Sequence, residues 1–447
     1  MELTIEKMSS DGNGIARTAD GVVFVSGALP GEIVEAEITQ RKRDFAVGRA
    51  KRIIQPNPKR ITPACPSFGT CGGCQLQHAS YGLQLEIKAD IVRDALTRIG
   101  GFTSTAVLGA ANVQRVKCEP SPSQWGYRNK AAFPVRKIKG KPTAGYYEAG
   151  SHRLALLRSC PVNAAPLNSL FTAIQGELPS LYLGVYDERE HKGALRHIVL
   201  RAGIYTGQTL ASLVVNGRLS AKNMNSIAGL CRALKNVTTF TLNHNSRPGN
   251  TILGDRTEAI KGDGCISEKL DEWTLRYDTS SFFQVNTDQA IAIYRHVRDL
   301  ASAGKAKDVL ELYSGVGSLT CYLARAEQLT AVEEWRSATG LMSKNLESNG
   351  LTNVMVINGK AEDVMTRLSG PHDLLVMDPP RSGCERPVLD RIIKMKINRV
   401  IYVSCNPATL ARDAKVLKEA GYTLKSVRAF DMFPQTVHVE TVVLMER

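Results

Sequence analysis

The feature that most constrains the fold lies in the last third of the chain, where short apolar runs alternate with longer amphipathic segments. From about residue 305 these runs are DVLEL, TAVE, VMVIN, LLVMD and RVIYVS, which span 308–312, 330–333, 354–358, 374–378 and 399–404. Runs of this length predict strands, and the segments between them predict helices. Because parallel strands need helical crossovers, we expect an α/β domain with a parallel sheet covered by helices on both faces.

Three motifs follow successive strands, at the sheet edge where open α/β sheets bind ligands. The turn ELYSGVGSLT carries Gly315 and Gly317, which let the backbone approach a ligand closely. Glu333 ends the next strand, where a carboxylate can bind ribose hydroxyls, and Asp378 begins a rigid Asp-Pro-Pro-Arg loop. Each motif alone could serve packing, a helix cap or a turn. Together they predict a methyltransferase, and the missing third glycine favours S-adenosylmethionine over a dinucleotide.

A cysteine and a glutamate near the C-terminus predict the reaction. Cys405 follows the strand that ends at Ser404 and precedes a helix that begins near Pro407, where we expect the helix N-terminus to lower the thiol pKa. Glu440 stands just before the last strand, TVVLM. Carbon 5 of a pyrimidine becomes nucleophilic only after a thiolate adds to C6, and a base must then remove the C5 proton. A methyltransferase that acts on an amine would leave both residues without a role. The structural alternative for Cys405 is that it packs in the core as a small apolar residue.

A second group of cysteines lies near the N-terminus, in the pattern C-x5-C-x2-C formed by Cys65, Cys71 and Cys74. Three thiolates within ten residues need a fourth ligand, and disulfides are not expected in the intracellular protein that we predict below. The spacing suits zinc or an iron–sulfur cluster equally. The candidates for the fourth ligand are Cys160, Cys118 and His78.

The segment before these cysteines and the one after them have their own patterns. Alternating apolar residues and Asp-Gly and Pro-Gly turns in residues 1–57 predict a small antiparallel β-barrel. Apolar residues recur at helical spacing between Ser80 and Arg98, which predicts a helix there.

The charge of the chain is concentrated in one window. The 447 residues have a formal net charge of +14, and residues 51–150 hold 15 basic and 5 acidic side chains. This excess favours a nucleic acid as partner over a merely solvated basic face. Trp125, Tyr127 and Phe133 lie in the same window and could stack on bases or pack in a core. No apolar run approaches the ~18 residues that span a bilayer, and the polar N-terminus does not read as a secretory signal, so we expect a soluble, cytoplasmic protein with no membrane partner.

Five long motifs make the chain resemble a known family. SFFQVN (281–286), ELYSGVGSLT (311–320), MDPPRSG (377–383), YVSCNPATLARD (402–413) and DMFPQTVHVET (431–441) are similar to the motifs of RNA uracil-5-methyltransferases of the RumA/TrmA type. The resemblance implies a TRAM domain at 1–57, a central α+β RNA-binding domain with an iron–sulfur cluster at 58–280 and a Rossmann-like methyltransferase domain at 281–447.

The resemblance also implies roles for individual residues. Cys405 matches the family's nucleophile and Glu440 its base. The residues that match the family's S-adenosylmethionine contacts are Gln284, Tyr313, Ser318, Glu333 and Asp378. The cysteine pattern implies a [4Fe–4S] cluster bound by Cys65, Cys71, Cys74 and Cys160. A member with both the cluster and the TRAM domain resembles the 23S rRNA enzymes; the alternatives are a tRNA enzyme and a non-catalytic RNA-binding protein of ribosome assembly. No obligate protein partner is inferred.

Overall fold

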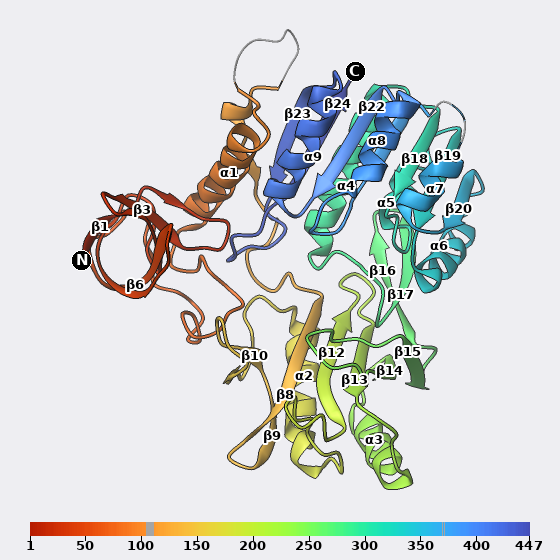
Figure 1. Ribbon diagram of the computed structural model, residues 1–447. Coiled ribbons are helices and arrows are strands. Elements are labelled where there is room, and N and C mark those ends of the chain that lie inside the picture. The colour runs from red at the N-terminus through yellow and green to blue at the C-terminus, as the bar shows by residue number, and fades with distance from the viewer. Residues whose placement is uncertain (104–110, 369, 371) are drawn as a thin grey trace.

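The structure is a computed structural model that describes residues 1–103, 111–368, 370 and 372–447. A small barrel, a central sheet and a large α/β sheet follow one another along the chain (Figure 1). No helix among the described residues has both the length and the apolar character needed to cross a membrane.

The N-terminal barrel has six strands in the order β1-β5-β6-β4-β3-β2. Their bounds are β1 Glu2–Thr4, β2 Lys7–Met8, β3 Gly14–Thr18, β4 Gly21–Ser26, β5 Ile33–Arg41 and β6 Phe45–Gln55. The expectation of a purely antiparallel barrel is wrong in one place, since β4 pairs with β6 in parallel. β5 comes between β4 and β6 in the chain and runs antiparallel to β6. β6 then lies beside β4 in the same direction. Alternate residues such as Val23, Val25 and Val34 fill the barrel interior.

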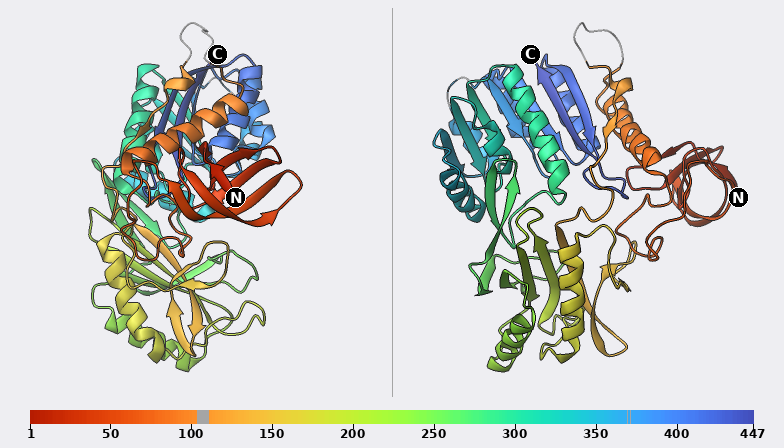
Figure 2. Two further views of the ribbon diagram at one scale, coloured as in Figure 1. Left: turned by 90° about the vertical axis from the view of Figure 1, so that its left-hand side faces the viewer. Right: turned by 180° about the vertical axis from the view of Figure 1, so that it is seen from behind.

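The predicted helix after the cysteine segment is present as α1 (Tyr81–Arg98), and Ser80 caps it by accepting a hydrogen bond from the amide of Leu83. Its apolar face shares a core with α9 (Pro407–Glu419) of the large sheet. A short 3-10 turn (Val113–Arg115) follows, and β7 (Cys118–Glu119) then pairs with β23 (Thr423–Phe430) as the last strand of that sheet. Although α1 and β7 lie far from the C-terminus in sequence, they pack with the C-terminal layer (Figure 2).

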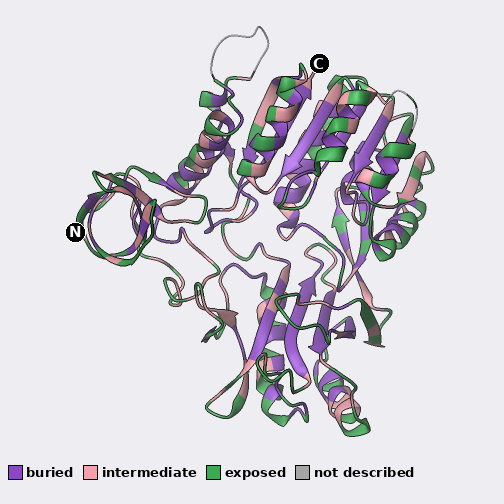
Figure 3. Cartoon of the chain, in the orientation of Figure 1, coloured by how far each residue is buried: buried purple, intermediate pink, exposed green. Residues whose placement is uncertain are grey.

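The central region contains a six-stranded sheet in the order β15-β14-β13-β12-β8-β9. The strands are β8 Lys130–Ile138, β9 Lys141–Ala144, β12 Leu195–Ala202, β13 Thr209–Val215, β14 Thr239–His244 and β15 Arg256–Lys261. Every residue of β12 and β13 is buried (Figure 3). The core on this sheet includes residues of α2 (Ala165–Glu177), which a 3-10 turn at Leu178–Ser180 extends, and of α3 (Ala221–Ala233). Two smaller strand pairs complete the region: β10 Tyr146–Tyr147 with β11 Leu154–Ala155, and β16 Cys265–Leu270 with β17 Trp273–Asp278.

The C-terminal sheet has eight strands in the order β20-β19-β18-β21-β22-β24-β23-β7. The five predicted strands are β18 Asp308–Leu312, β19 Gln328–Glu333, β20 Val354–Asn358, β21 Leu374–Met377 and β22 Arg399–Ser404, and all pair in parallel as expected. The last strand, β24 (Glu440–Glu446), runs antiparallel to β22. The strand order reverses direction at β18 and β21, which marks the switch point where such sheets bind ligands.

Helices cover both faces of this sheet, so the α/β expectation is confirmed. One core joins the sheet to α1, α7 (Ala361–Arg367), α8 (Arg386–Met395) and α9. The opposite core joins it to α4 (Thr287–Ala303), α5 (Ser318–Leu323) and α6 (Arg336–Ser348). Within β22, Val400 and Tyr402 point into the first core and Ile401 and Val403 into the second. The alternation explains why each strand reads as an unbroken apolar run.

Candidate active site

A cavity of about 890 Å³ opens at the carboxyl ends of the parallel strands, where the C-terminal sheet meets the central region. Residues after β18, β19, β21 and β22 line it, together with the first residue of β24 and the loop between β14 and β15. The predicted site residues in the lining are Gln284, Tyr313, Glu333, Asp378, Cys405 and Glu440. Six of the seven residues predicted for catalysis and cofactor binding therefore meet in one cavity.

Glu333 connects two of the motifs. Its carboxylate accepts a hydrogen bond of 2.9 Å from the amide of Gly315 and another of 2.9 Å from the amide of Trp335. Gly315 has a φ of 58° and Gly317 a φ of 91°, values that L side chains rarely adopt. A Cβ on Gly317 would also lie 2.9 Å from Cγ of Met342. The glycine turn therefore brings its backbone to the Glu333 carboxylate, which faces the cavity.

Asp378 and Gln284 form a second polar pair on the cavity wall. The Gln284 amide lies within 3.5 Å of an Asp378 carboxylate oxygen, and Asn129 fixes the Gln284 carbonyl with a hydrogen bond of 2.9 Å. Burial raises the pKa of Asp378 to about 7, against the opposing effect of the hydrogen bond from Gln284. A cationic ligand bound beside this carboxyl group would lower its pKa and favour its charged form. Tyr313 adds its ring to the same wall, with its backbone in the left-handed region at a φ of 64°.

Cys405 directly follows β22, and Glu440 is the first residue of β24, the antiparallel neighbour of β22. Ser404, the last residue of β22, pairs with Thr441 of β24, and Cys405 and Glu440 are the residues one step beyond this pair. The charge of Glu440 acts on the Cys405 thiol, so the two side chains lie near each other. Both side chains line the cavity.

The electrostatics of this pair differ from the expectation that the helix N-terminus would lower the pKa of Cys405. Burial raises the pKa of that thiol to about 11, with further increases from the negative charges of Glu440 and Asp378. Burial and the charge of Asp378 also raise the pKa of Glu440 well above its usual value. The prediction was wrong because burial of the thiol disfavours its charged form, and the two carboxyl groups that share the cavity add to this effect.

The structure adds a residue to the site that the motif reading left without a role. Arg381, the last residue of the Asp-Pro-Pro-Arg loop, opposes these effects by lowering the pKa of Cys405 through its charge and a hydrogen bond. It also counteracts the rise in the pKa of Glu440. The sequence signal that could have indicated a role for Arg381 is its position directly after the rigid pair Pro379 and Pro380.

Several aromatic residues also take positions that sequence reasoning could not fix. Phe282 and Trp335 line the cavity with 68% and 65% of their surfaces exposed. By contrast, Tyr127 and Phe133 are buried, the first with its hydroxyl bonded to the carbonyl of Pro434 and the second against Phe171. These two side chains therefore pack in the interior and do not form a surface on which RNA bases could stack.

Ser318, the seventh predicted residue, does not line the cavity. It is the first residue of α5, is 8% exposed and has Tyr294 as a hydrogen-bonding neighbour.

The four predicted cluster cysteines lie close enough to influence one another. The charges of Cys160, Cys71 and Cys65 contribute, after burial, to raising the pKa of Cys74 to about 12. Of the other two candidate ligands, Cys118 lies on β7 near Lys88 and Asp431, and the ring of His78 packs against Phe68 of the cysteine segment. Within the described residues, no group of three or more His, Cys, Asp or Glu side chains is arranged to hold a single metal ion.

Comparison with known proteins identifies the family. Residues 204–447 match the model of the tRNA (uracil-5-)-methyltransferase family, and residues 1–51 match the TRAM domain. RNA methyltransferases of Gloeobacter violaceus and Halalkalibacterium halodurans are 39% and 36% identical, over 99% and 100% of this chain and 95% and 96% of theirs.

A solved structure is similar over the full length of both chains. It is the tRNA (uracil-54, C5)-methyltransferase of Pyrococcus abyssi in complex with S-adenosyl-L-homocysteine, with a TM-score of 0.77 and 26% sequence identity over 100% of each chain. The chain therefore belongs to the tRNA (uracil-5-)-methyltransferase family of S-adenosylmethionine-dependent RNA methyltransferases.

Proposed function

We propose that the protein methylates carbon 5 of a uridine in RNA, with Cys405 as the nucleophile and Glu440 as the base. The observation that carries this proposal is that the two residues lie near each other in one cavity, one step beyond the Ser404–Thr441 pair. A methyltransferase for an oxygen or an amine would gain nothing from a thiol there.

The residues support the following sequence of steps. The Cys405 thiolate bonds to C6 of the uracil, and the electrons of the C5–C6 double bond move toward C5 and the C4 carbonyl. C5 then takes the methyl group that S-adenosylmethionine supplies. The Glu440 carboxylate removes the proton from C5, the double bond reforms, and the C–S bond breaks to return the thiolate. Arg381 stabilises the charge on Cys405 at the first and last steps, as its effect on the thiol pKa indicates.

The cavity residues fit the chemistry of the methyl donor. Glu333 lies where a carboxylate binds ribose hydroxyls, and Asp378 offers a carboxyl group that a cationic ligand would ionise. We assign cofactor binding to Gln284, Tyr313, Glu333 and Asp378. Ser318 is left out of this set because it is buried and does not line the cavity.

For the cysteine segment we propose a [4Fe–4S] cluster bound by Cys65, Cys71, Cys74 and Cys160. A cluster bonds each thiolate to a different iron atom, so its four ligands surround a larger body and need not converge on one point, as the ligands of a zinc ion must. Backbone amides also point at these sulfurs: the amide of Gly73 lies 3.4 Å from the sulfur of Cys71. Hydrogen bonds to sulfur are a usual feature of such sites. We expect a structural role, since methyl transfer moves no electrons.

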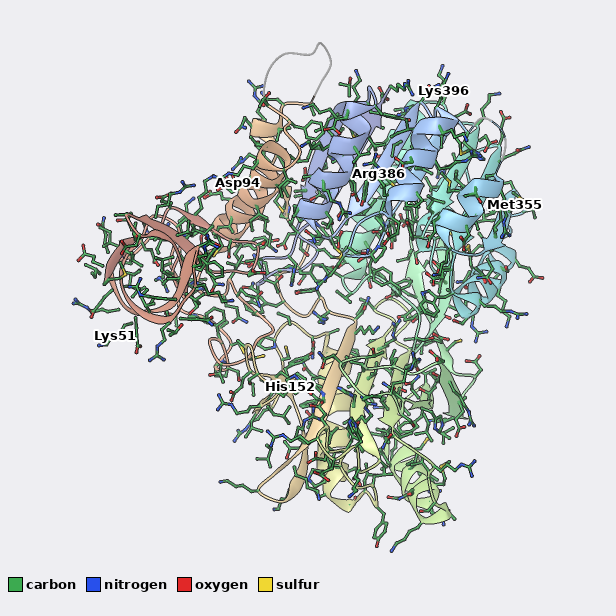
Figure 4. All side chains as sticks on the ribbon, in the orientation of Figure 1. Lys51, Asp94, His152, Met355, Arg386 and Lys396 are labelled. Carbon is green, nitrogen blue, oxygen red and sulfur yellow. The ribbon has the colours of Figure 1, made fainter. Side chains whose placement is uncertain are left out.

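We propose 23S rRNA as the substrate, because of the combination of the TRAM domain with the cysteine segment. A basic side chain suits the RNA backbone: the exposed Lys51 lies on the outside of the barrel (Figure 4). A second candidate is tRNA, which the likeness to the Pyrococcus abyssi enzyme favours. In either RNA the target uridine must leave its stack to reach the cavity, at a cost of a few kcal/mol that is smallest in a loop.

The experiment is to map 5-methyluridine in the rRNA and tRNA of a strain that lacks the gene. Loss of one or more sites in 23S rRNA, restored by the wild-type gene but not by Cys405→Ala, is the expected result. Loss confined to tRNA would select the second candidate. Unchanged 5-methyluridine in both RNAs would contradict the proposed reaction.

A further inference from the structure

The segment that leads into Glu440 is buried although it has no regular secondary structure. This segment, residues 431–439, is called the strap here; it joins β23 to β24 and contributes Phe433 to the cavity just before the chain reaches Glu440. Of its nine residues only Phe433 and His438 are more than slightly exposed. Irregular segments usually lie at the surface, because buried backbone groups must find hydrogen-bond partners. The position of Glu440 therefore depends on the groups that form hydrogen bonds with the buried backbone of the strap.

The strap is held through four consecutive carbonyl groups by donors from outside it. The carbonyl of Met432 accepts from Asn286 at 3.3 Å, that of Phe433 from Lys88 at 3.0 Å and that of Pro434 from Tyr127 at 3.0 Å. The carbonyl of Gln435 accepts from the amides of Gln75 and Leu76, at 3.1 and 2.9 Å. These donors come from α1, from the cysteine segment, from the residue before α4 and from the loop that precedes β8. None belongs to the strands that carry Cys405 and Glu440.

Helix α1 makes the most specific of these contacts. Gln84 donates to the side-chain oxygen of Gln435 at 3.0 Å and accepts from the amide of the same residue at 2.9 Å. This pair of bonds fixes Gln435 with a φ of 72°, a backbone conformation that few non-glycine residues adopt. One turn later, Lys88 forms an ion pair with Asp431, and both side chains are fully buried. Gln84 and Lys88 are four residues apart, so they project from the same face of α1.

We propose that Gln84 and Lys88 are positioning residues for the base, and that they hold the strap so that Glu440 reaches the C5 proton. The inference rests on the proposed function, since it assumes that Glu440 removes this proton. Cys405 and Arg381 lie on other segments, so Glu440 is the one group of the proposed thiol and proton chemistry that follows directly from the strap. Loosening the strap should therefore slow proton removal alone, and the methylated RNA should remain bonded to Cys405.

The variant that tests this is Gln84→Leu, which keeps the volume of the side chain and removes both bonds to Gln435. The enzyme is mixed with substrate RNA and S-adenosylmethionine, and the covalent complex is quantified on a denaturing gel. We expect kcat to fall about tenfold, because two buried hydrogen bonds to the strap are lost, with the KM for RNA unchanged. The fraction of enzyme in the covalent complex should rise as kcat falls. Lys88→Arg, which keeps the charge, should give a smaller effect than Lys88→Met.

Two controls separate the possible failures. Glu86 lies on the same helix and forms an exposed ion pair with Lys59, which precedes the helix. Glu86→Gln removes this ion pair and should leave both turnover and adduct at the wild-type level. Glu440→Gln should accumulate adduct; if it does not, the proposed role of Glu440 fails and this inference fails with it. If Glu440→Gln accumulates adduct but Gln84→Leu loses turnover and adduct in parallel, Gln84 only stabilises the fold, and the positioning inference alone is overturned.

Discussion

Cys405 and Glu440 lie near each other, one step beyond the Ser404–Thr441 pair that ends the antiparallel register of β22 and β24. The nucleophile and the base of the proposed reaction thus lie at the ends of adjacent strands. Burial raises the pKa of both groups; the charges of Glu440 and Asp378 add to the rise for Cys405, and the charge of Asp378 adds to it for Glu440. The free enzyme therefore holds the Cys405 thiol mainly in its protonated form at neutral pH, and the bound reactants must shift it toward the thiolate.

Arg381 is the residue that favours the thiolate, so removing its charge should slow thiol chemistry. The pKa of Cys405, about 11 in the native protein, should rise in Arg381→Gln, and each unit of that rise lowers the thiolate fraction at neutral pH about tenfold. The alkylation rate of Cys405, followed by mass spectrometry of its peptide, should fall by the same factor as kcat/KM. In the wild type this rate should increase with pH throughout the range below 11. Arg381→Lys, which keeps the charge, should lose less; equal alkylation rates in wild type and Arg381→Gln would refute this role.

Glu311 should make the protein less stable as the pH rises. It is 2% exposed on β18, and burial raises its pKa from 4.5 to about 8. Below pH 4.5 the group is protonated in both the folded and the unfolded chain. Between pH 4.5 and 8 the unfolded chain releases this proton and the folded protein retains it, so the free energy of unfolding decreases with pH.

Glu311→Gln removes this titration and should raise Tm more at pH 8 than at pH 5. Thermal unfolding of the two proteins at both pH values measures the difference. Glu347→Gln, at an exposed position on α6, serves as the control and should show no such dependence. An equal change in Tm at the two pH values would show that Glu311 is not the group responsible.

The cysteine segment should bind iron in the protein purified without oxygen. Cys71→Ala removes one of the four proposed ligands and should abolish the brown absorbance and the bound iron, and reduce solubility as well. Cys231→Ala, on α3 in the core of the central sheet, should retain both iron and colour. Iron content and the visible spectrum of the two variants check this; a brown Cys71→Ala protein with full iron would contradict the assigned ligands.

The sequence predicted the parts of the fold that depend on local pattern. The strands of the parallel sheet and the helix from Ser80 to Arg98 follow from apolar periodicity, and the site residues at the sheet edge follow from the topology of parallel strands. It did not predict that α1 packs on the C-terminal sheet, because Gln84 and Lys88 read as ordinary polar positions of a helix. Their partners lie more than 300 residues away in sequence, at Gln435 and Asp431.

The pKa of Cys405 shows a second limit of prediction from sequence. The helix that begins after Cys405 could be predicted from the sequence. The burial of the thiol and the nearby charges of Glu440 and Asp378 arise only when the strands assemble into the sheet. Likewise, Tyr127 and Phe133 matched the composition of an RNA-binding surface until the fold placed them in the interior. The division of the chain at residues 57 and 280 stays a prediction, and it would assign α1 and β7 to the central region although they pack with the C-terminal sheet.

The central claim is that Cys405 bonds to the RNA and Glu440 releases it. The most direct measurement is a denaturing gel of Glu440→Gln after incubation with substrate RNA and S-adenosylmethionine, beside the same variant that also carries Cys405→Ala. A slowly migrating covalent complex in the single variant, methylated on the RNA and absent from the double variant, is the predicted result. No complex in the single variant, or one that persists without Cys405, would contradict the account.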